Sequence, residues 1–144
     1  NFLNMKNKSM YFGASVEHLV LSKLIDEGRE AYLPVVDDHG VDMLVKSKEG
    51  AQAEWQELQV KSLHEGGLFA AISCPMPKPN YWFVFYVKSH DTLWLINSMD
   101  FVQLASQNSP NCKNANKYSI SVSTKKGLRK AMMKYVITDF SKLP

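Results

Sequence analysis

The chain has 144 residues, the size of one ordinary domain. Hydrophobic residues make up 45% and charged residues 22%, which is the balance of a soluble globular protein that buries its own core. No stretch approaches the ~18 consecutive apolar residues of a membrane span, and the polar N-terminus lacks the apolar core of a signal peptide. We therefore expect a soluble, cytoplasmic protein without a membrane partner, with a flexible segment over residues 1–8 and one domain over residues 9–144.

The two cysteines, Cys74 and Cys112, are isolated in the sequence. No CxxC motif and no histidine at zinc-ligand spacing accompanies them. We expect two free thiols in a reducing compartment.

The first half of the chain predicts one helix and three strands. Residues 9–27 carry an apolar stripe of helical period, and Gly28 then provides a stop. Asp37, Asp38, His39 and Gly40 have the composition of a turn, and a polar loop follows the next extended run. The expected strands lie at residues 31–36, 41–46 and 54–62.

The second half predicts three further strands and two helices. A long connection over residues 64–80 allows a short strand at 68–72, and residues 81–87 form an apolar run typical of a central strand. Residues 92–97 return as the next strand, and residues 117–122 form the last one. Ser98 is the expected N-cap of a helix over 99–106, and Thr124 that of a helix over 125–136. This order predicts a mixed central sheet flanked by helices, an α/β (α+β) fold.

One stretch concentrates residues suited to phosphodiester chemistry. Asp42 lies in the second expected strand, and Gln59 and Lys61 lie in the third. Because residues two apart in a strand point to the same side, Gln59 and Lys61 share a face, while Leu58 and Val60 point into the core. If the two strands form a hairpin, Asp42 lies beside Gln59 and Lys61 at one sheet edge.

These groups form a candidate metal site. Mg²⁺ and Mn²⁺ prefer oxygen ligands, which Asp42, Gln59 and the carbonyl of Val60 offer. Such a cation polarises a phosphate and lowers the pKa of an attacking water, and Lys61 orients that water or offsets developing charge. Glu17, at the margin of the apolar stripe of the first helix, is a candidate helper.

The basic residues are unevenly distributed. The C-terminal part of the chain contains a basic stretch without acids, whereas acids cluster near the centre. This pattern fits a protein that binds phosphate groups and holds a cation, and a solvated surface helix is the alternative interpretation. The candidate nucleic-acid-binding residues are Lys113, Lys117, Lys125, Lys126, Arg129, Lys130 and Lys134.

Together these features resemble the PD-(D/E)XK nuclease superfamily, in particular archaeal Holliday junction resolvases and related restriction-endonuclease-like domains of bacteria. The resemblance covers roughly residues 9–106 and rests on the helix with Glu17, on Gly40-Val41-Asp42 and on Gln59-Val60-Lys61-Ser62. It implies a restriction-endonuclease-like core with Glu17, Asp42, Gln59 and Lys61 as the active site and Mg²⁺ or Mn²⁺ as cofactor. It also implies DNA, branched DNA included, as the substrate and a homodimer as the assembly.

One position departs from the family pattern. The family usually has an acid where this chain has Gln59, and the loss of one negative charge weakens cation binding. Glu57 on the same strand face, and Asp37 and Asp38 in the preceding turn, are candidates to compensate, although Glu57 is better explained as exposed or salt-bridged. The alternative function is a catalytically weak or inactive nuclease-fold module that binds nucleic acid or a protein partner.

Overall fold

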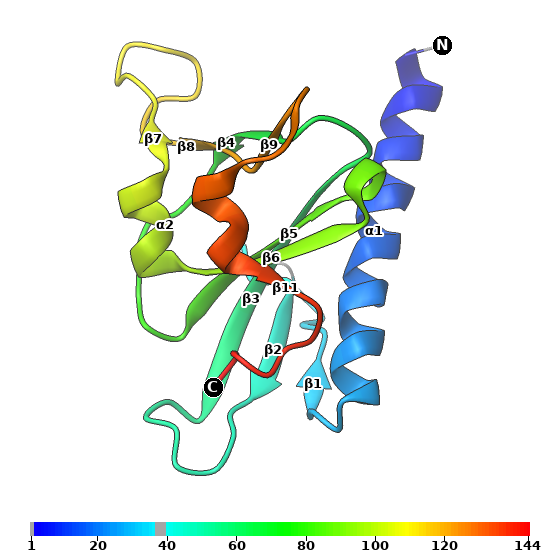
Figure 1. Ribbon diagram of the computed structural model, residues 1–144, viewed down its shortest axis with the longest axis vertical. Helices are drawn as coiled ribbons and strands as arrows, with labels where there is room; N and C mark the ends of the chain where they lie inside the picture. Colours follow the sequence, from blue (N-terminus) through cyan, green and yellow to red (C-terminus); the bar gives the residue numbers. More distant parts are fainter. Residues whose placement is uncertain (1, 37–39) are drawn as a thin grey trace.

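The computed structural model describes residues 2–36 and 40–144, and its centre is a six-stranded sheet (Figure 1). The strand order is β1-β2-β3-β5-β6-β11, and β3 and β5 are the one parallel pair among these neighbours. The strands are β1 (Ala31–Tyr32), β2 (Met43–Lys46), β3 (Trp55–Leu63), β5 (Tyr81–Val87), β6 (Thr92–Asn97) and β11 (Val136–Ile137).

The long helix α1 (Phe2–Asp26) covers one face of the sheet (Figure 1). Its residues Val16, Val20 and Leu24 are buried against Leu58 and Val60 of β3. The apolar spacing of α1 places these side chains on one side of the helix, as the sequence predicts. We call this the helix-side core.

A second layer covers the opposite face. Phe83 and Phe85 of β5 pack there against Phe69 of β4, Phe101 of α2 and Met132 of η2. We call this the second-layer core. The elements of the layer are β4 (Leu68–Ile72), α2 (Ser98–Leu104), β7 (Ser106–Gln107), β8 (Tyr118–Ser121), β9 (Ser123–Thr124), β10 (Gly127–Leu128) and the 3-10 helix η2 (Lys130–Tyr135).

Several expected elements are confirmed. The strands at residues 68–72, 81–87 and 92–97 are present, and a short 3-10 helix, η1 (Lys88–His90), joins the last two. The strands β2 and β3 form the expected antiparallel hairpin. The mixed α/β architecture is therefore as predicted.

The C-terminal helix expected over residues 125–136 is wrong. Gly127 has a φ of 117°, a conformation that side chains rarely adopt, and the chain turns there instead of continuing a helix. Leu128 pairs back with Ser123 in the β9-β10 hairpin, and the Thr124 hydroxyl accepts a hydrogen bond from the Lys126 N–H within the turn. Only the six residues of η2 are helical, and they form a 3-10 helix.

The first helix begins earlier than expected, at Phe2 rather than near residue 9. Residues 2–8, expected to form a flexible segment, continue this helix. The sequence contains no glycine or proline before Gly13, and methionine and lysine are good helix formers. The expectation failed because the apolar stripe that marks a packed helix starts only at Phe12.

Three other boundaries differ from the expected ones. The strand expected over residues 31–36 ends at Tyr32, because Pro34 lacks the N–H that a sheet ladder needs. The strand expected over residues 41–46 begins only at Met43. The helix expected after Ser98 begins at Ser98 itself, and its cap is Asn97, whose side chain accepts from the Met99 N–H at 2.9 Å.

The remaining expectations concern membrane spans, the two cysteines and a turn. Within the described residues, no helix is long and apolar enough to span a membrane. Cys74 and Cys112 are both free thiols, as predicted. The expected turn at Asp37, Asp38 and His39 lies outside the described residues.

Gly67, just before β4, marks a close approach to Ser123 of β9 within the second layer. Its carbonyl accepts from the Val122 N–H at 2.8 Å, and a Cβ at Gly67 would lie only 2.7 Å from the backbone nitrogen of Ser123. We expect Gly67→Ala to lower the free energy of unfolding by about 2 kcal/mol or more, because the backbone of Ser123 must shift. Urea denaturation measures this change.

Gly13 provides the matched control. It lies inside α1 with nothing within 4 Å of an added Cβ. We expect Gly13→Ala to raise the free energy of unfolding by about 0.5–1 kcal/mol, because alanine restricts the unfolded chain and favours the helix. Equal effects of the two substitutions would contradict the close approach at Gly67.

Candidate active site

The site lies just before β2 begins, at Asp42, one residue ahead of the strand. The Asp42 N–H donates to the Leu58 carbonyl at 2.9 Å, and its carboxylate oxygen Oδ2 accepts from the Val60 N–H at 2.7 Å. In a regular hairpin, a backbone carbonyl of the neighbouring strand would accept from that N–H. The Asp42 side chain therefore replaces the missing strand and lies against the peptide of Val60.

The same edge presents a backbone oxygen. In an antiparallel ladder the N–H and C=O of one residue point to the same side, and residues two apart repeat that direction. Leu58 uses this side to accept from Asp42, so the carbonyl of Val60 faces the edge that β2 has vacated. The Asp42 carboxylate and the Val60 peptide therefore lie together at this edge.

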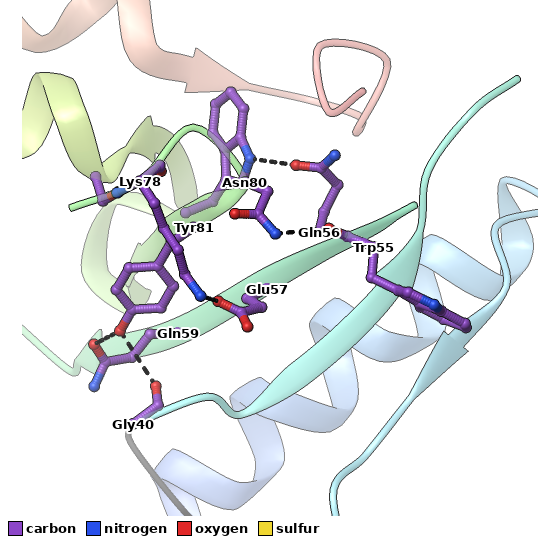
Figure 2. A network of polar contacts seen from close by, with 10 residues as sticks. Gly40, Trp55, Gln56, Glu57, Gln59, Lys78, Asn80 and Tyr81 are labelled. Carbon is purple, nitrogen blue, oxygen red and sulfur yellow. Dashed lines mark hydrogen bonds and ion pairs between the residues drawn. The ribbon is translucent and has the colours of Figure 1, made fainter. Parts of the chain in front are cut away.

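Gln59 is held by a hydrogen bond on the second-layer face of β3. Its side chain is 7% exposed, and its Oε1 accepts from the Tyr81 hydroxyl at 2.7 Å (Figure 2). The same hydroxyl lies 3.4 Å from the Gly40 carbonyl oxygen. Gly40 has a φ of 73°, and a Cβ there would lie 3.1 Å from Gln59 Nε2, so glycine suits both the turn and the close approach.

The pKa of Tyr81 ties Asp42 to the same neighbourhood. Burial raises the pKa of this phenol most, and the negative charges of Cys74, Asp42 and Glu57 raise it further. The phenol therefore stays protonated and remains a donor to Gln59. Asp42 is thus near enough to Tyr81 for its carboxylate to raise the pKa of the phenol.

Lys61 and Glu17 approach this site from different sides. Lys61 is half-buried, two residues after Gln59 on the same strand face, and pairs opposite Phe85 of β5. Glu17 is half-buried on α1, the helix that covers the other face of β3. The structure thus confirms that Gln59 and Lys61 share a face, and it places Glu17 across the sheet from them.

The position of Glu17 along β3 follows from an aromatic contact. Phe12 of α1 stacks on His64, just beyond the end of β3, with ring centroids 3.8 Å apart. Five residues of helix advance ~7.5 Å, and two to three residues of strand advance ~7–10 Å. Glu17 therefore lies near the level of Lys61 and Ser62, close to the end of β3 where the site is found.

Glu57 has a partner of its own. Its carboxylate forms an ion pair with Lys78 Nζ at 2.6 Å (Figure 2). The explanation of Glu57 as a salt-bridged residue is confirmed. Its negative charge is already balanced by Lys78, so it is a poor candidate to replace the charge that is missing at Gln59. Asp37 and Asp38, the other candidates to compensate, lie outside the described residues.

The oxygens at this edge suit a hard cation of the magnesium type. No three His, Cys, Asp or Glu side chains gather as a metal site in the part of the chain that the structure describes. A cation here would depend on a mixed set, with one carboxylate from Asp42, an amide oxygen from Gln59 and the carbonyl of Val60. This set fits Mg²⁺, which protein sites usually bind through one or two carboxylates together with waters and substrate phosphates.

Sequence reasoning missed Tyr81. This residue was assigned to the apolar run of the central strand, where a ring is usually part of the core. The ring is indeed buried, but the hydroxyl reaches Gln59. The available signal was a phenol at the first position of an otherwise apolar strand, directly after Pro79 and Asn80.

The basic residues lie on the second layer rather than along one helix. The β7-β8 loop carries Lys113 and Lys117, and the β9-β10 turn carries Lys125 and Lys126. All seven are exposed except the half-buried Lys117. Arg129 donates from Nη1 to the Ser121 carbonyl at 2.8 Å, Lys130 and Lys134 belong to η2, and Lys134 Nζ lies 5.1 Å from the ring centroid of Tyr135.

No protein-family model matches the sequence, and no curated protein matches it. A solved structure of a bacterial homing endonuclease, I-Ssp6803I, does match in three dimensions, with a TM-score of 0.57 and 15% identity over 86% of this chain and 85% of that one. The chain has a nuclease-like fold. At this identity the likeness establishes the fold alone, and the chemistry must come from the site itself.

The Tyr81 phenol predicts a pH effect on stability. Its folded pKa is raised above the unfolded value of about 10, so its contribution is complete below pH ~10 and is lost as the pH rises. We expect Tyr81→Phe to cost about 1 kcal/mol at neutral pH, because Gln59 loses a donor, and to flatten the loss of stability that begins above pH ~10. Urea unfolding at neutral pH and at alkaline pH values on either side of about 10 measures both effects.

The matched control is Tyr11→Phe, which removes a phenol that is 77% exposed on α1. We expect this variant to follow the native chain at every pH. A Tyr81→Phe profile parallel to the native one would show that the buried phenol does not govern the alkaline limb.

Proposed function

We propose that this protein is a metal-dependent endonuclease that hydrolyses phosphodiester bonds in DNA. One observation carries the proposal: just before β2 begins, the Asp42 carboxylate accepts from the Val60 peptide of β3, the strand that also carries the buried Gln59. The similarity in fold to a structure described as a bacterial homing endonuclease supports it.

Each residue of the proposed site has a separate role. Asp42, Gln59 and the Val60 carbonyl would hold Mg²⁺ or Mn²⁺, which when bound supplies Lewis-acid polarisation of the phosphate and lowers the pKa of water. Lys61 orients the attacking water or offsets negative charge in the transition state. Glu17, near the level of Lys61 on α1, acts as the helper.

Tyr81 acts as a positioning residue in this scheme. Its hydroxyl donates to Gln59 Oε1 and so fixes the rotamer of a side chain that would otherwise turn freely. An amide oxygen has two lone pairs, so one remains for a cation while the other accepts from Tyr81. The neutral Gln59 thus becomes a directed ligand, although it lacks the charge of an acid.

The finer assignments belong to the same proposal. Membership of the PD-(D/E)XK superfamily is supported by the placement of Asp42, Gln59, Val60 and Lys61 around one strand end. Action on branched DNA and the homodimer stay predictions of the sequence resemblance, and the cytoplasmic location stays a prediction of the composition and the cysteine pattern.

A specific observation favours the second candidate, a nuclease-fold module that binds nucleic acid or protein without cutting. Asp42 Oδ2 and Gln59 Oε1 both accept hydrogen bonds from the protein itself. A cation must therefore share these oxygens with internal donors, in a site that has one acid fewer than the family pattern. Binding without cleavage is the expected behaviour of this candidate.

The cleavage experiment uses duplex, single-stranded and branched DNA with Mg²⁺ or Mn²⁺. We expect the native chain to cut, and Asp42→Asn and Lys61→Ala to lower the rate by about 100-fold or more while DNA binding persists. Asp42→Asn is informative because its amide oxygen still accepts from the Val60 N–H, so the fold is kept while the charge is lost. Gel-resolved product formation gives the rates.

Matched substitutions at exposed positions serve as controls. Asp100→Asn on α2 and Lys142→Ala near the C-terminus change the same residue types outside the site. Both should cut at the native rate. Binding in low salt without cleavage by the native chain under either metal would replace the nuclease with the binding module.

The basic residues of the second layer are the proposed phosphate contacts. We expect Lys130→Ala to weaken DNA binding in every sequence context and to reduce the slope of log K against log salt by about 0.9, because one phosphate contact is lost. Fluorescence anisotropy at several salt concentrations measures the slope. An unchanged slope, or an equal change in Lys142→Ala, would remove η2 from the interface.

A further inference from the structure

A cavity of about 570 Å³ adjoins the candidate active site. It lies between the segment after β1, which contributes Pro34 and Val36, and the segment before β5, which contributes Pro75 and Met76. Leu44 of β2 also lines the cavity. Its volume falls within the range of pockets that hold small molecules.

The cavity and the site share residues. Tyr81 lines the cavity, and its hydroxyl is the group that holds Gln59. Glu57 also lines the cavity and precedes Gln59 by two residues on the same strand face, an advance of ~6.6 Å along β3. If a phosphate group lies beside Gln59 and Asp42, a chemical group attached next to that phosphate can therefore enter the cavity.

The chemistry of the lining suits a flat ring with a polar edge. Proline, valine and methionine side chains provide apolar surfaces, and the Glu57–Lys78 ion pair supplies an acceptor and a donor inside the cavity (Figure 2). An apolar protein side chain would fill the space but make no use of this pair. A nucleobase uses both, because its faces stack on apolar groups while its edge forms hydrogen bonds.

Fixed backbone angles and cross-links restrain parts of the cavity lining. Pro34 and Pro75 have fixed φ angles. The segment before β5 is also held to β3 by the Lys78–Glu57 ion pair. The Asn80 side chain adds a hydrogen bond of 3.0 Å to the Trp55 carbonyl (Figure 2). Such walls lose little conformational entropy when a ligand enters.

We propose that this cavity receives one unstacked nucleobase next to the phosphate that is cut, so that the protein selects DNA with an unpaired base at that position. The inference rests on the proposed function, since it takes the ligand to be nucleic acid. An unpaired base enters at least cost, because no base pair must be broken first. Selectivity would thus arise from how easily the DNA releases a base at that position, rather than from recognition of a long DNA sequence.

The test measures binding in metal-free buffer, so that no cleavage intervenes. The probe is a short duplex with one bulged 2-aminopurine, compared with the same duplex fully paired. We expect the native chain to bind the bulged duplex at least about tenfold more tightly, and the 2-aminopurine emission to change on binding as the base leaves the helix.

Two substitutions distinguish binding of a base in the cavity from binding of DNA elsewhere on the surface. Leu44→Trp adds bulk at a half-buried position in the lining and should abolish the preference, with duplex binding unchanged. Leu68→Trp makes the same change on β4, where Leu68 is 61% exposed and outside the cavity. This control should retain the full preference. Circular dichroism checks that both variants are folded.

Each outcome decides the inference. Equal affinity for bulged and paired duplexes, or a preference that survives Leu44→Trp, overturns it even if the native chain cuts duplex DNA, and the proposed function then stands alone. A preference that Leu44→Trp abolishes supports the cavity even if no metal permits cleavage, in which case only the hydrolytic function falls. Absence of DNA binding overturns both.

Discussion

The late start of β2 is the constraint on which the site depends. The strand begins only at Met43, while its antiparallel partner β3 continues past that point to Leu63. On its β2 side, the Val60 peptide is therefore left without a strand neighbour in a largely buried place, where an unpaired N–H is costly. The Asp42 carboxylate accepts that N–H and brings a negative charge to the vacated edge. Asp42 thus has two roles, as the acceptor for a buried N–H and as the source of negative charge at the site. A substitution tests the charge alone only if the new side chain still accepts this hydrogen bond.

The strand β3 links this edge to both cores. Leu58 and Val60 enter the helix-side core, while Gln59 and Lys61 face the second-layer side. A shift of β3 by one residue would exchange these faces and bury the polar groups in the wrong core. The two apolar layers therefore fix the register of the catalytic candidates, and Tyr81 adds a lateral restraint from β5. Precision at the site comes from the sheet rather than from the loops around it.

The sequence predicted most of the central sheet and less of the periphery. The β2-β3 hairpin, β5 and β6 follow from alternating or continuous apolar runs, and these patterns also placed Gln59 and Lys61 on one face. The helix expected near the C-terminus failed because Gly127 and the pairing of Leu128 with Ser123 outweigh an amphipathic pattern. The role of Tyr81 was hidden because composition reports a buried ring, whereas the direction of its hydroxyl depends on the parallel pairing of β3 with β5. That pairing is tertiary information.

The crossover between β3 and β5 has a consequence for synthesis on the ribosome. The chain leaves β3, forms β4 in the second layer and only then returns as β5. The partner of β4 is β8, which is encoded far downstream. A nascent chain that has emerged as far as β6 can pair its central strands, but the face bearing Phe83 and Phe85 still lacks most of its cover. Contacts of such large sequence separation form slowly, and exposed aromatic surface of this kind is what chaperones bind. The last third of the chain, which carries none of the proposed metal ligands, must therefore be synthesised before this aromatic face is covered and protected from aggregation.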